Sequence, residues 1–488
     1  MRGRIAPVGP TEVEMKIGCR VIGIMVLLAA ATLAAGQSDA SLRDASGPDL
    51  LSCSPAPCIL PPTQASEGGA EVTDTPIVAD PLNSARLLLG SVDANCPFGS
   101  GAGFHVSADG GSTWSVTCMP ILHFGGRVYY VGGQPMVAYD LDGTAYIATE
   151  YGDSEGLGYG LVGIQKSTDG IHWSPVMSLS GDGFSSPNYS WMAVDITAAS
   201  PYVNSLYVST LVIYGELHDT QLVVSHSNNG GETWTAVPVG PKDTNDLFTN
   251  LSVGRDGTVY LTWQYCPGIE NCQNGIGYML FSKSIDGGNT WSEPVLIATI
   301  VSNRALGQCQ CGISSLPNTD EIRVYDYPVI GADNSNGPYT RNLYVVMQTW
   351  TGTNLQVELV RSTDGGETWS KPIPVAPTSD THDQFFPWLS VSPTGLVGVS
   401  WLDRRNDPAN VSYQAFAAIS SDGGQSFQPN VLLTKNFSNP NNNGYPNNRW
   451  MGDYSGSTWD GPDYFIAAWM DSSNGVDMQE EVGGIRLK

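Results

Sequence analysis

Short apolar runs alternate with glycine-containing polar turns along most of the chain. Clear examples are the segments 136–151, 251–265 and 389–403, each of which contains an apolar run, a turn and a second apolar run. A third run follows, as at 355–362, and then a fourth, as at 293–299. Short runs bounded by turn residues about every 8–12 positions are typical of β-strands. The pattern therefore predicts units of four antiparallel strands.

A motif of about eight residues recurs six times between the third and fourth runs. The copies lie at 107–114, 167–173, 227–234, 284–291, 362–369 and 420–427. Their acid positions are 109, 169, 229, 286, 364 and 422, so the steps between copies are 60, 60, 57, 78 and 58 residues. The long step contains the segment 309–323, which we interpret as an insertion. A nearly fixed period of this kind indicates a repeat-built domain.

The chemistry of the motif is that of a tight turn. Its Asp or Asn accepts hydrogen bonds from backbone N–H groups, its glycines allow positive φ, and its final Trp or Phe buries a large ring. The motif resembles the Asp box of sialidases and other bacterial neuraminidase repeat (BNR) proteins, and the resemblance covers roughly residues 72–488. It implies an all-β propeller of four-stranded antiparallel blades. In that family each box joins the third and fourth strands of a blade, away from the active face.

Seven blades are expected, with six as the alternative. The strand pattern occurs a seventh time after the last box, at 451–471, and a third strand follows at 481–487. No seventh box and no fourth strand remain before Lys488. We therefore expect a strand from the N-terminal region, within residues 70–80, to complete this blade and close the ring.

Residues 1–36 are predicted to be a signal peptide. Basic residues after Met15, which is an alternative start, precede an apolar run at 21–35 and small residues at 34–36. Residues 37–71 are expected to be a flexible segment, and residues 72–488 the propeller. Because the apolar run is short for a membrane span and no similar run follows, we expect a secreted or periplasmic protein without a membrane span.

Eight cysteines follow the predicted signal peptide, an even number that agrees with an oxidising compartment. They form the near pairs Cys53 and Cys58, Cys96 and Cys118, Cys266 and Cys272, and Cys309 and Cys311. We expect local disulfides; a zinc site is the alternative, but it lacks histidine or CxxC partners. We expect that the protein requires no cofactor. A structural calcium ion, bound by loops rich in Asp and Asn, is an alternative that the sequence leaves open.

The net charge narrows the range of partners. With 22 Lys and Arg against 47 Asp and Glu, the chain carries a formal charge of −25. Such a chain is not expected to bind a nucleic-acid backbone, which requires a basic surface. We expect the protein to be a monomer and its partner to be a glycan or glycoconjugate. An acidic ligand would have to be bound in a local pocket of arginines.

One face of the predicted propeller gathers the unusual polar residues. The loops that join strands 2 and 3 share this face with the loops that join strand 4 to the next blade. Three distinctive stretches fall there, at 380–388, 401–407 and 449–456. They are interpreted either as parts of a site or as Arg–Asp networks that tie neighbouring blades together.

The resemblance to sialidases implies roles for residues on this face. Sialidases bind the substrate carboxylate with three arginines, attack with a tyrosine that a glutamate polarises, and protonate with an aspartate. The implied anion-binding residues are Arg127, Arg404, Arg405 and Arg449. The implied nucleophile is Tyr454, its partner is Glu150, and the acid is Asp403 or Asp383. The Arg-Ile-Pro stretch that sialidases carry before the first box is absent here, and Arg86 alone lies in that region.

Two functions are expected from these observations. The first is an exported sialidase-like glycoside hydrolase of the exo-α-sialidase type, acting on terminal acidic sugars. The alternative is a non-catalytic BNR-repeat propeller that binds carbohydrate or protein outside the cell. Arginines that converge near Tyr454 would favour the enzyme, whereas arginines held in ion pairs between blades would favour the binding protein.

Overall fold

Strands make up the regular structure of the described residues, and no α-helix occurs among them. The computed structural model describes residues 57–97, 101–153, 160–179, 186–214, 219–242, 244–266, 274–303, 312–319, 321–376, 381–443 and 450–488. All of them belong to one compact unit of the chain. The predicted signal peptide and residues 37–56 of the predicted flexible segment lie outside the described residues.

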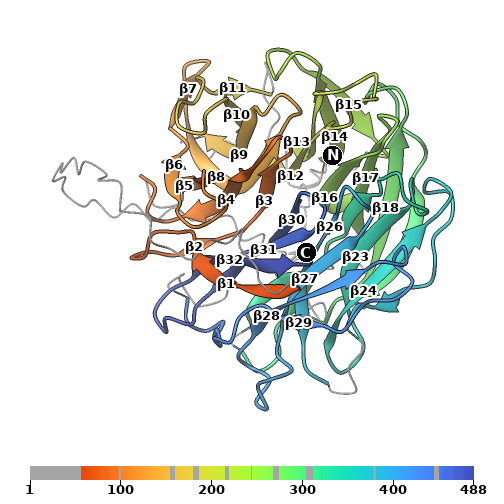
Figure 1. The fold of residues 1–488 in the computed structure, drawn as a ribbon. Coiled ribbons are helices and arrows are strands. Elements are labelled where there is room, and N and C mark those ends of the chain that lie inside the picture. The colour runs from red at the N-terminus through yellow and green to blue at the C-terminus, as the bar shows by residue number, and fades with distance from the viewer. Residues whose placement is uncertain are drawn as a thin grey trace, which may run out of the picture. The chain divides into compact units, whose positions relative to one another are not determined.

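The strands form seven four-stranded antiparallel blades, which confirms the predicted β-propeller and the favoured blade number (Figure 1). The first blade contains β3 (Ile77–Asp80), β4 (Asn83–Asp93), β5 (Gly101–Ser107) and β6 (Ser115–Cys118), and the short β2 (Val72–Thr73) pairs with the end of β4. The second contains β8 (Arg127–Tyr139), β9 (Ala145–Asp153), β10 (Gly160–Ser167) and β11 (Met177–Ser178), with β7 (Leu122–Phe124) added beside β8. The third contains β12 (Pro187–Val194), β13 (Leu206–Tyr214), β14 (Asp219–Ser227) and β15 (Thr235–Val239).

The fourth blade contains β16 (Asn245–Val253), β17 (Val259–Cys266), β18 (Ile276–Ser284) and β19 (Val295–Val301). The fifth contains β22 (Val329–Ala332), β23 (Leu343–Trp350), β24 (Leu355–Ser362) and β25 (Ile373–Pro374). The sixth contains β26 (Gln384–Val391), β27 (Val397–Asp403), β28 (Gln414–Ser420) and β29 (Val431–Leu432). The predicted insertion between the fourth and fifth blades contains a separate hairpin of β20 (Ile313–Ser315) and β21 (Arg323–Tyr325).

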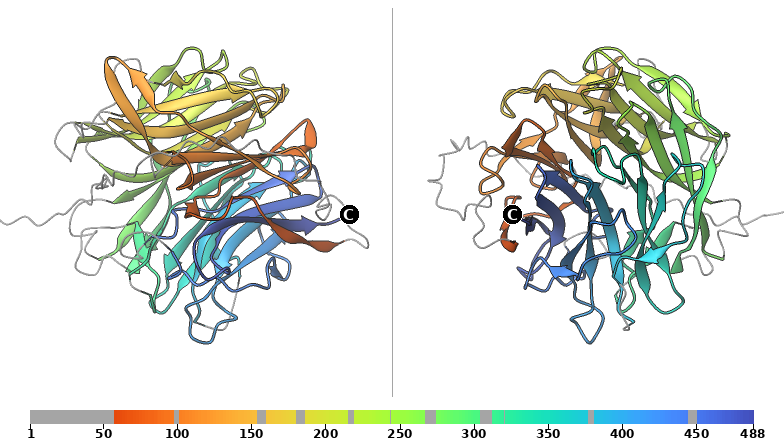
Figure 2. Two further views of the ribbon diagram at one scale, coloured as in Figure 1. Left: turned by 90° about the vertical axis from the view of Figure 1, so that its left-hand side faces the viewer. Right: turned by 45° about the vertical axis from the view of Figure 1, so that its right-hand side comes forward.

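The seventh blade is closed by the N-terminal strand. It contains β30 (Gly456–Asp460), β31 (Tyr464–Asp471), β32 (Gln479–Arg486) and, as its outer strand, β1 (Cys58–Gln64). The red β1 lies beside the blue β32 in Figure 1, and Figure 2 shows the first and last blades side by side from two further directions. The sequence pattern places the closing strand within 70–80 and starts the propeller at 72; the structure instead uses β1, so the propeller begins earlier.

The first strand of each blade lies nearest the axis. β12 contacts β8 and β16, β22 contacts β16 and β26, and β30 contacts β26 and β3, so the inner strands follow one another around the ring. The face on which these inner strands begin therefore collects one chain segment from every blade around the axis.

Each of the six boxes begins at the last residue of a third strand, as the family resemblance implies. In the fifth box the Ser362 hydroxyl donates to Asp364 Oδ1 at 2.7 Å, and Thr368 N–H donates to the same oxygen at 3.0 Å. The hydrogen bonds from the Thr368 hydroxyl and backbone lower the pKa of Asp364 to about 2. In the third box Asn229 replaces the acid and accepts the equivalent bond from Thr233 N–H at 3.0 Å. The boxes are therefore turns that the scaffold repeats.

The boxes also join neighbouring blades. The Trp369 ring of the fifth box packs edge-on against Phe281 of the fourth blade, with ring centroids 5.4 Å apart. Gly366 has a φ of 90°, and a Cβ at this position would lie 2.2 Å from the Phe281 ring. Glycine is thus required here both by the backbone conformation and by the close approach of the next blade.

Disulfide bonds support the predicted cysteine chemistry where it falls on described residues. Cys96 and Cys118 are joined by a disulfide bond in the first blade. Cys58 and Cys266 each take part in a further disulfide bond. Cys53, Cys272, Cys309 and Cys311 lie outside the described residues. Within the described part of the chain, no helix has the length and hydropathy needed to cross a membrane.

Candidate functional site

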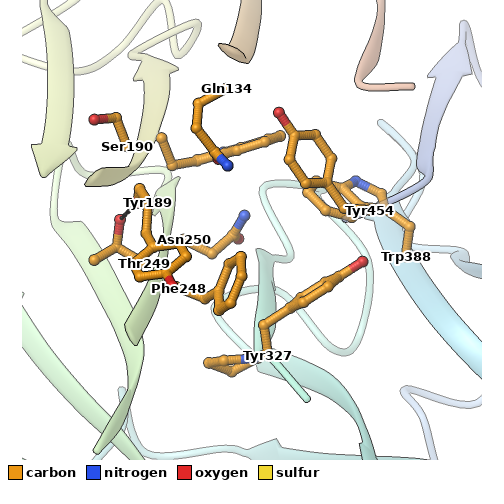
Figure 3. A pocket seen from close by; sticks show the side chains of 11 residues that line it. Gln134, Tyr189, Ser190, Phe248, Thr249, Asn250, Tyr327, Trp388 and Tyr454 are labelled. Atoms are coloured by element: carbon orange, nitrogen blue, oxygen red, sulfur yellow. Dashed lines mark hydrogen bonds between the residues drawn. The ribbon is translucent and has the colours of Figure 1, made fainter. Parts of the chain in front are cut away.

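A narrow pocket lies at the inner strands of six blades (Figure 3). Its walls are mainly aromatic, and amide and hydroxyl groups add hydrogen-bonding capacity. The lining residues are Gln134, Tyr189, Ser190, Trp191, Phe248, Thr249, Asn250, Tyr327, Pro328, Trp388 and Tyr454. Apolar pockets with a few convergent polar groups are typical sites for small ligands, and aromatic rings supply large contact areas.

The inner strands are distorted at this pocket. Gln134, Tyr189, Phe248 and Phe386 have φ values of 57°, 54°, 41° and 50°, in the left-handed region that non-glycine residues seldom occupy. β-Bulges occur in the same segments of β8, β12, β16 and β26. Such conformations cost roughly 1–3 kcal/mol each and cluster at functional sites. The repetition of this strain around one pocket supports its assignment as the site.

Tyr454 forms part of the aromatic wall. Its ring centroid lies 5.7 Å from that of Trp191 and 5.9 Å from that of Trp388, and its hydroxyl donates to the Pro135 carbonyl at 2.8 Å. Only 3% of the residue is exposed, and this burial raises the pKa of the Tyr454 phenol well above its ordinary value. The predicted nucleophile therefore lies at the pocket with its hydroxyl hydrogen-bonded to the scaffold.

Glu150, the predicted partner of Tyr454, lies near the end of β9 and is buried. Its Oε1 accepts a hydrogen bond from Ser190 N–H at 2.9 Å, and Ser190 lines the pocket. Burial raises the pKa of Glu150 to about 7, and its charge would interact with Tyr454. The structure thus brings these two predicted residues to the same region.

Four other predicted residues are engaged in local ion pairs in the sixth blade. Arg404 is fully buried and donates to Asp383 Oδ2 at 3.3 Å and to the Pro317 carbonyl at 2.8 Å. Burial lowers the pKa of Arg404 to about 10 and raises that of Asp383. Arg405 pairs with Asp403, which also accepts from Trp401 Nε1 at 2.7 Å. None of these four ionisable residues lines the pocket.

The remaining predicted arginines also do not line it. Arg127, at the start of β8, lies 3.6 Å from Asp153 Oδ2 and is one-third exposed. Arg449 lies outside the described residues. Within the described residues, the predicted triad of arginines around Tyr454 is therefore not assembled. No group of three or more His, Cys, Asp or Glu side chains in that part of the chain is arranged to hold a metal ion.

Two carboxylates and an arginine next to the pocket had no assigned role in the sequence analysis. Asp453 N–H donates to Asp74 Oδ1, and the Asp453 carboxylate lies 3.4 Å from Arg323 and accepts from Trp450 Nε1. Asp74 and Asp453 are 1% and 5% exposed. Burial is the main cause of the raised pKa of both carboxyls, and the pKa of Asp74 is raised more strongly.

A positional signal for these residues exists in the sequence. Asp74 and Asp453 each stand three residues before the first strand of their blade, and Asp326 stands at the same position before β22. Aligning the blades at their first strands, rather than at the boxes, would have selected all three aspartates. Arg323 lies at the end of the inserted segment and has no counterpart in other blades.

The comparisons with known proteins agree with the fold. A model described as the BNR/Asp-box repeat matches residues 360–371, which include the whole of the fifth box. The chain is a propeller that carries these repeats. Over 310 residues it is 25% identical to a xyloglucanase from Paenibacillus sp., a match that covers 60% of this chain. The matched region spans 26% of the length of that relative.

Two solved structures match the chain at low sequence identity. A Hadza microbial sialidase matches with 14% identity and a TM-score of 0.44, covering 80% of this chain and 73% of the other. An ulvan lyase from a polysaccharide lyase family matches with 12% identity and a TM-score of 0.49, covering 86% of this chain and 95% of the other. Backbone likeness at these values carries no information on activity.

Proposed function

We propose that this protein is a carbohydrate-active enzyme, a glycoside hydrolase that binds an uncharged glycan in the axial pocket. The observation that carries the proposal is the set of six aromatic rings on one strained pocket, with carboxyl groups directly beside it. Sugar rings present apolar C–H faces and hydroxyl edges. Aromatic walls match the faces, and the amides of Gln134 and Asn250 match the hydroxyls.

The charges around the pocket favour an uncharged sugar. Glu150, Asp74 and Asp453 lie beside the lining tyrosines, and among the described residues the cation near them is Arg323, which already faces Asp453. A sugar carboxylate brought to this region would add a negative charge beside carboxyls whose own ionisation is already disfavoured by burial. The 25% identity to a xyloglucanase is consistent with a neutral polysaccharide substrate. The predicted signal peptide would deliver the enzyme outside the cytoplasm.

A sialidase-type activity is the second candidate, because Tyr454 lines the pocket and Glu150 accepts a hydrogen bond from Ser190, which also lines it. That mechanism also needs an arginine cluster for the substrate carboxylate. Arg404 and Arg405 are held by Asp383 and Asp403, so an acidic sugar would have to be bound by other groups.

The test is a hydrolysis screen of the purified protein. The substrates are xyloglucan, 4-nitrophenyl glycosides of neutral hexoses and pentoses, and a 4-methylumbelliferyl sialoside. We expect release of neutral sugar, with kcat/KM reduced about tenfold or more in Trp388→Ala, since a lost ring contact is worth roughly 0.5–1.5 kcal/mol beyond area burial. Trp369→Phe, in the fifth box, is the matched control and should retain wild-type kcat/KM.

Each other outcome has a definite meaning. Cleavage of the sialoside alone would replace the neutral-glycan proposal by the sialidase candidate. Binding of xyloglucan without cleavage of any substrate would identify a non-catalytic binding propeller. If Trp388→Ala and Trp369→Phe behaved alike, the axial pocket would not be the site.

A further inference from the structure

A buried histidine faces a buried carboxyl at the seam between the first and last blades. His105 lies on β5 and Glu480 on β32, and the two residues are 1% and 0% exposed. His105 Nε2 lies 3.2 Å from Glu480 Oε2 and 3.0 Å from Ser91 Oγ on β4. Among the described residues, neither carboxyl oxygen of Glu480 has a hydrogen-bond partner. His105 is therefore the group positioned to share a proton with this carboxyl.

The same part of the seam closes the propeller ring. Just after β1, Ala65 N–H donates to the Glu480 carbonyl at 2.8 Å, and Glu480 N–H donates to Ser66 Oγ at 2.9 Å. Val72 N–H donates to the Met478 carbonyl at 3.0 Å, while the strand that contains Val72, β2, pairs with β4 of the first blade. The segment 65–73 thus joins the first blade to β32 at the residue that carries the buried carboxyl.

The surroundings of the pair oppose a second charge. The ionisable groups around it are carboxyls of β4 and of the N-terminal segment, namely Asp93, Asp74, Glu71 and Glu67. Burial, together with the charges of Asp93 and Asp74, raises the pKa of Glu480 well above its ordinary value. Burial lowers the pKa of His105 to about 4. Over a wide pH range the folded pair therefore holds one proton.

An open seam would hold its protons differently. In water the glutamate would titrate near 4.5 and the histidine near 6.5, their ordinary pKa values. Between these values the open pair also holds one proton, on the histidine, so its opening is not coupled to pH. Above pH 6.5 the open pair holds none, so opening releases a proton and becomes easier as the pH rises. Below pH 4.5 the open pair holds two, so opening becomes easier as the pH falls.

We propose that His105 and Glu480 form a proton-dependent latch that closes the propeller ring between its first and last blades. Loss of the shared proton in alkaline solution leaves a buried carboxylate without compensation, which favours release of residues 65–73 from both blades. Opening reaches the axial pocket because Thr75 N–H donates to the Tyr454 carbonyl at 3.2 Å. The latch requires no ligand and is independent of the proposed function.

Hydrogen exchange of backbone amides tests the latch in the wild-type protein. The seam is followed at Ala65 and Val72, and the reference amides are those of β23 in the fifth blade. Protection factors remove the intrinsic pH dependence of exchange. Above pH 6.5 we expect seam protection, divided by that of β23, to fall about tenfold or more per pH unit. A ratio that stays constant above pH 6.5 would overturn the proposal, and no variant has to fold for this test.

Two variants separate the contributions of the pair. Relative to the wild type, Glu480→Gln should gain about tenfold in seam protection per pH unit above 4.5, over the range in which the folded Glu480 stays protonated. His105→Gln should gain about tenfold per pH unit as the pH falls from 6.5 to about 4, because the open wild-type seam then takes up a proton on the histidine. The two differences have opposite slopes, and the contributions of the neighbouring carboxyls cancel in both.

His226→Gln is the matched control. His226 lies on β14 of the third blade, is partly buried, and has a pKa that burial lowers. This variant should keep wild-type protection at the seam at every pH. A Glu480→Gln profile parallel to that of the wild type would show that Glu480 is not the group that titrates. A parallel His105→Gln profile would remove the histidine from the latch.

The latch and the proposed function fail separately. The exchange measurements use no glycan, so a seam that does not respond to pH would refute the latch and leave the glycan proposal standing. A hydrolysis screen without any cleaved or bound glycan would refute the proposed function and leave the exchange profiles unchanged.

Discussion

Replacing Glu150 with glutamine should make the protein more stable at alkaline pH and leave its stability unchanged near pH 4.5. The Glu150 carboxyl is 6% exposed, and one of its oxygens accepts from Ser190 N–H at 2.9 Å. Burial raises the pKa of this carboxyl from 4.5 to about 7. Glutamine has the same shape, keeps an oxygen for Ser190 and never ionises.

The direction follows from proton linkage. Because the folded-state pKa lies above the unfolded-state value, the folded protein holds the proton more tightly than the unfolded chain does. The stability that this provides is complete below pH 4.5 and is lost as the pH rises to about 7. A difference from 4.5 to about 7 corresponds to roughly 3 kcal/mol at about 1.4 kcal/mol per pH unit. The free energy of unfolding of the glutamine variant should therefore rise relative to that of the wild type as the pH increases from 4.5 to about 7.

The assay is the thermal unfolding midpoint of Glu150→Gln minus that of the wild type, measured from pH 4.5 to 8. For a chain of this size, roughly 3 kcal/mol corresponds to a difference of a few degrees at pH 8 that vanishes at pH 4.5. Glu232→Gln is the control, because the Glu232 side chain is 69% exposed. A Glu150→Gln difference that is constant with pH would refute the assignment of Glu150 as a buried carboxyl that titrates near neutrality.

Three further predictions concern the scaffold. Replacing Cys96 and Cys118 with serine opens a loop of sequence separation 22, so stability should fall by about 3 kcal/mol, measured by urea unfolding with and without reductant. Asp364→Ala should lower stability by about 1 kcal/mol, because the hydrogen bonds of the turn are lost. Asp364→Asn should lower it by less, because Asn229 makes the same turn in the third box. Equal losses of the two variants in thermal unfolding would contradict this account. Deleting Cys58–Gln64 should lower the unfolding midpoint sharply because it exposes the edge of β32, and a deletion variant with a wild-type midpoint would show that β1 does not close the ring.

The blades could be predicted from the sequence because the residues that form each turn lie close together in the chain. Each box contains its own hydrogen-bond donors and acceptors within a few residues, so the same turn forms wherever the motif occurs. β1 was not predictable in this way, because its sequence CILPPTQ contains two prolines and does not alternate. Proline is tolerated there since β1 is an outer strand, and the prolines coincide with a register shift between Leu60 and Thr63.

Local sequence identified only part of the candidate site. Tyr454 lines the pocket and Glu150 is joined to it through Ser190, because the inner strands of neighbouring blades converge on the axis. The arginines were implied by the family resemblance, but Arg405 pairs with Asp403 only two residues away. The sequence alone does not distinguish such a local ion pair from a ligand site. Asp74 depends on a partner 379 residues away, and no local pattern encodes that contact.

The repeat explains why equivalent aspartates can have different roles. Asp74, Asp326 and Asp453 stand at the same distance before an inner strand, so the fold buries all three near the axis. Asp326 has both oxygens satisfied by Gln348 and Ser314, and it therefore serves as a buried structural link. Asp74 has one oxygen without a partner among the described residues. Because the backbone position is the same, the difference in role follows from the neighbours that each blade supplies.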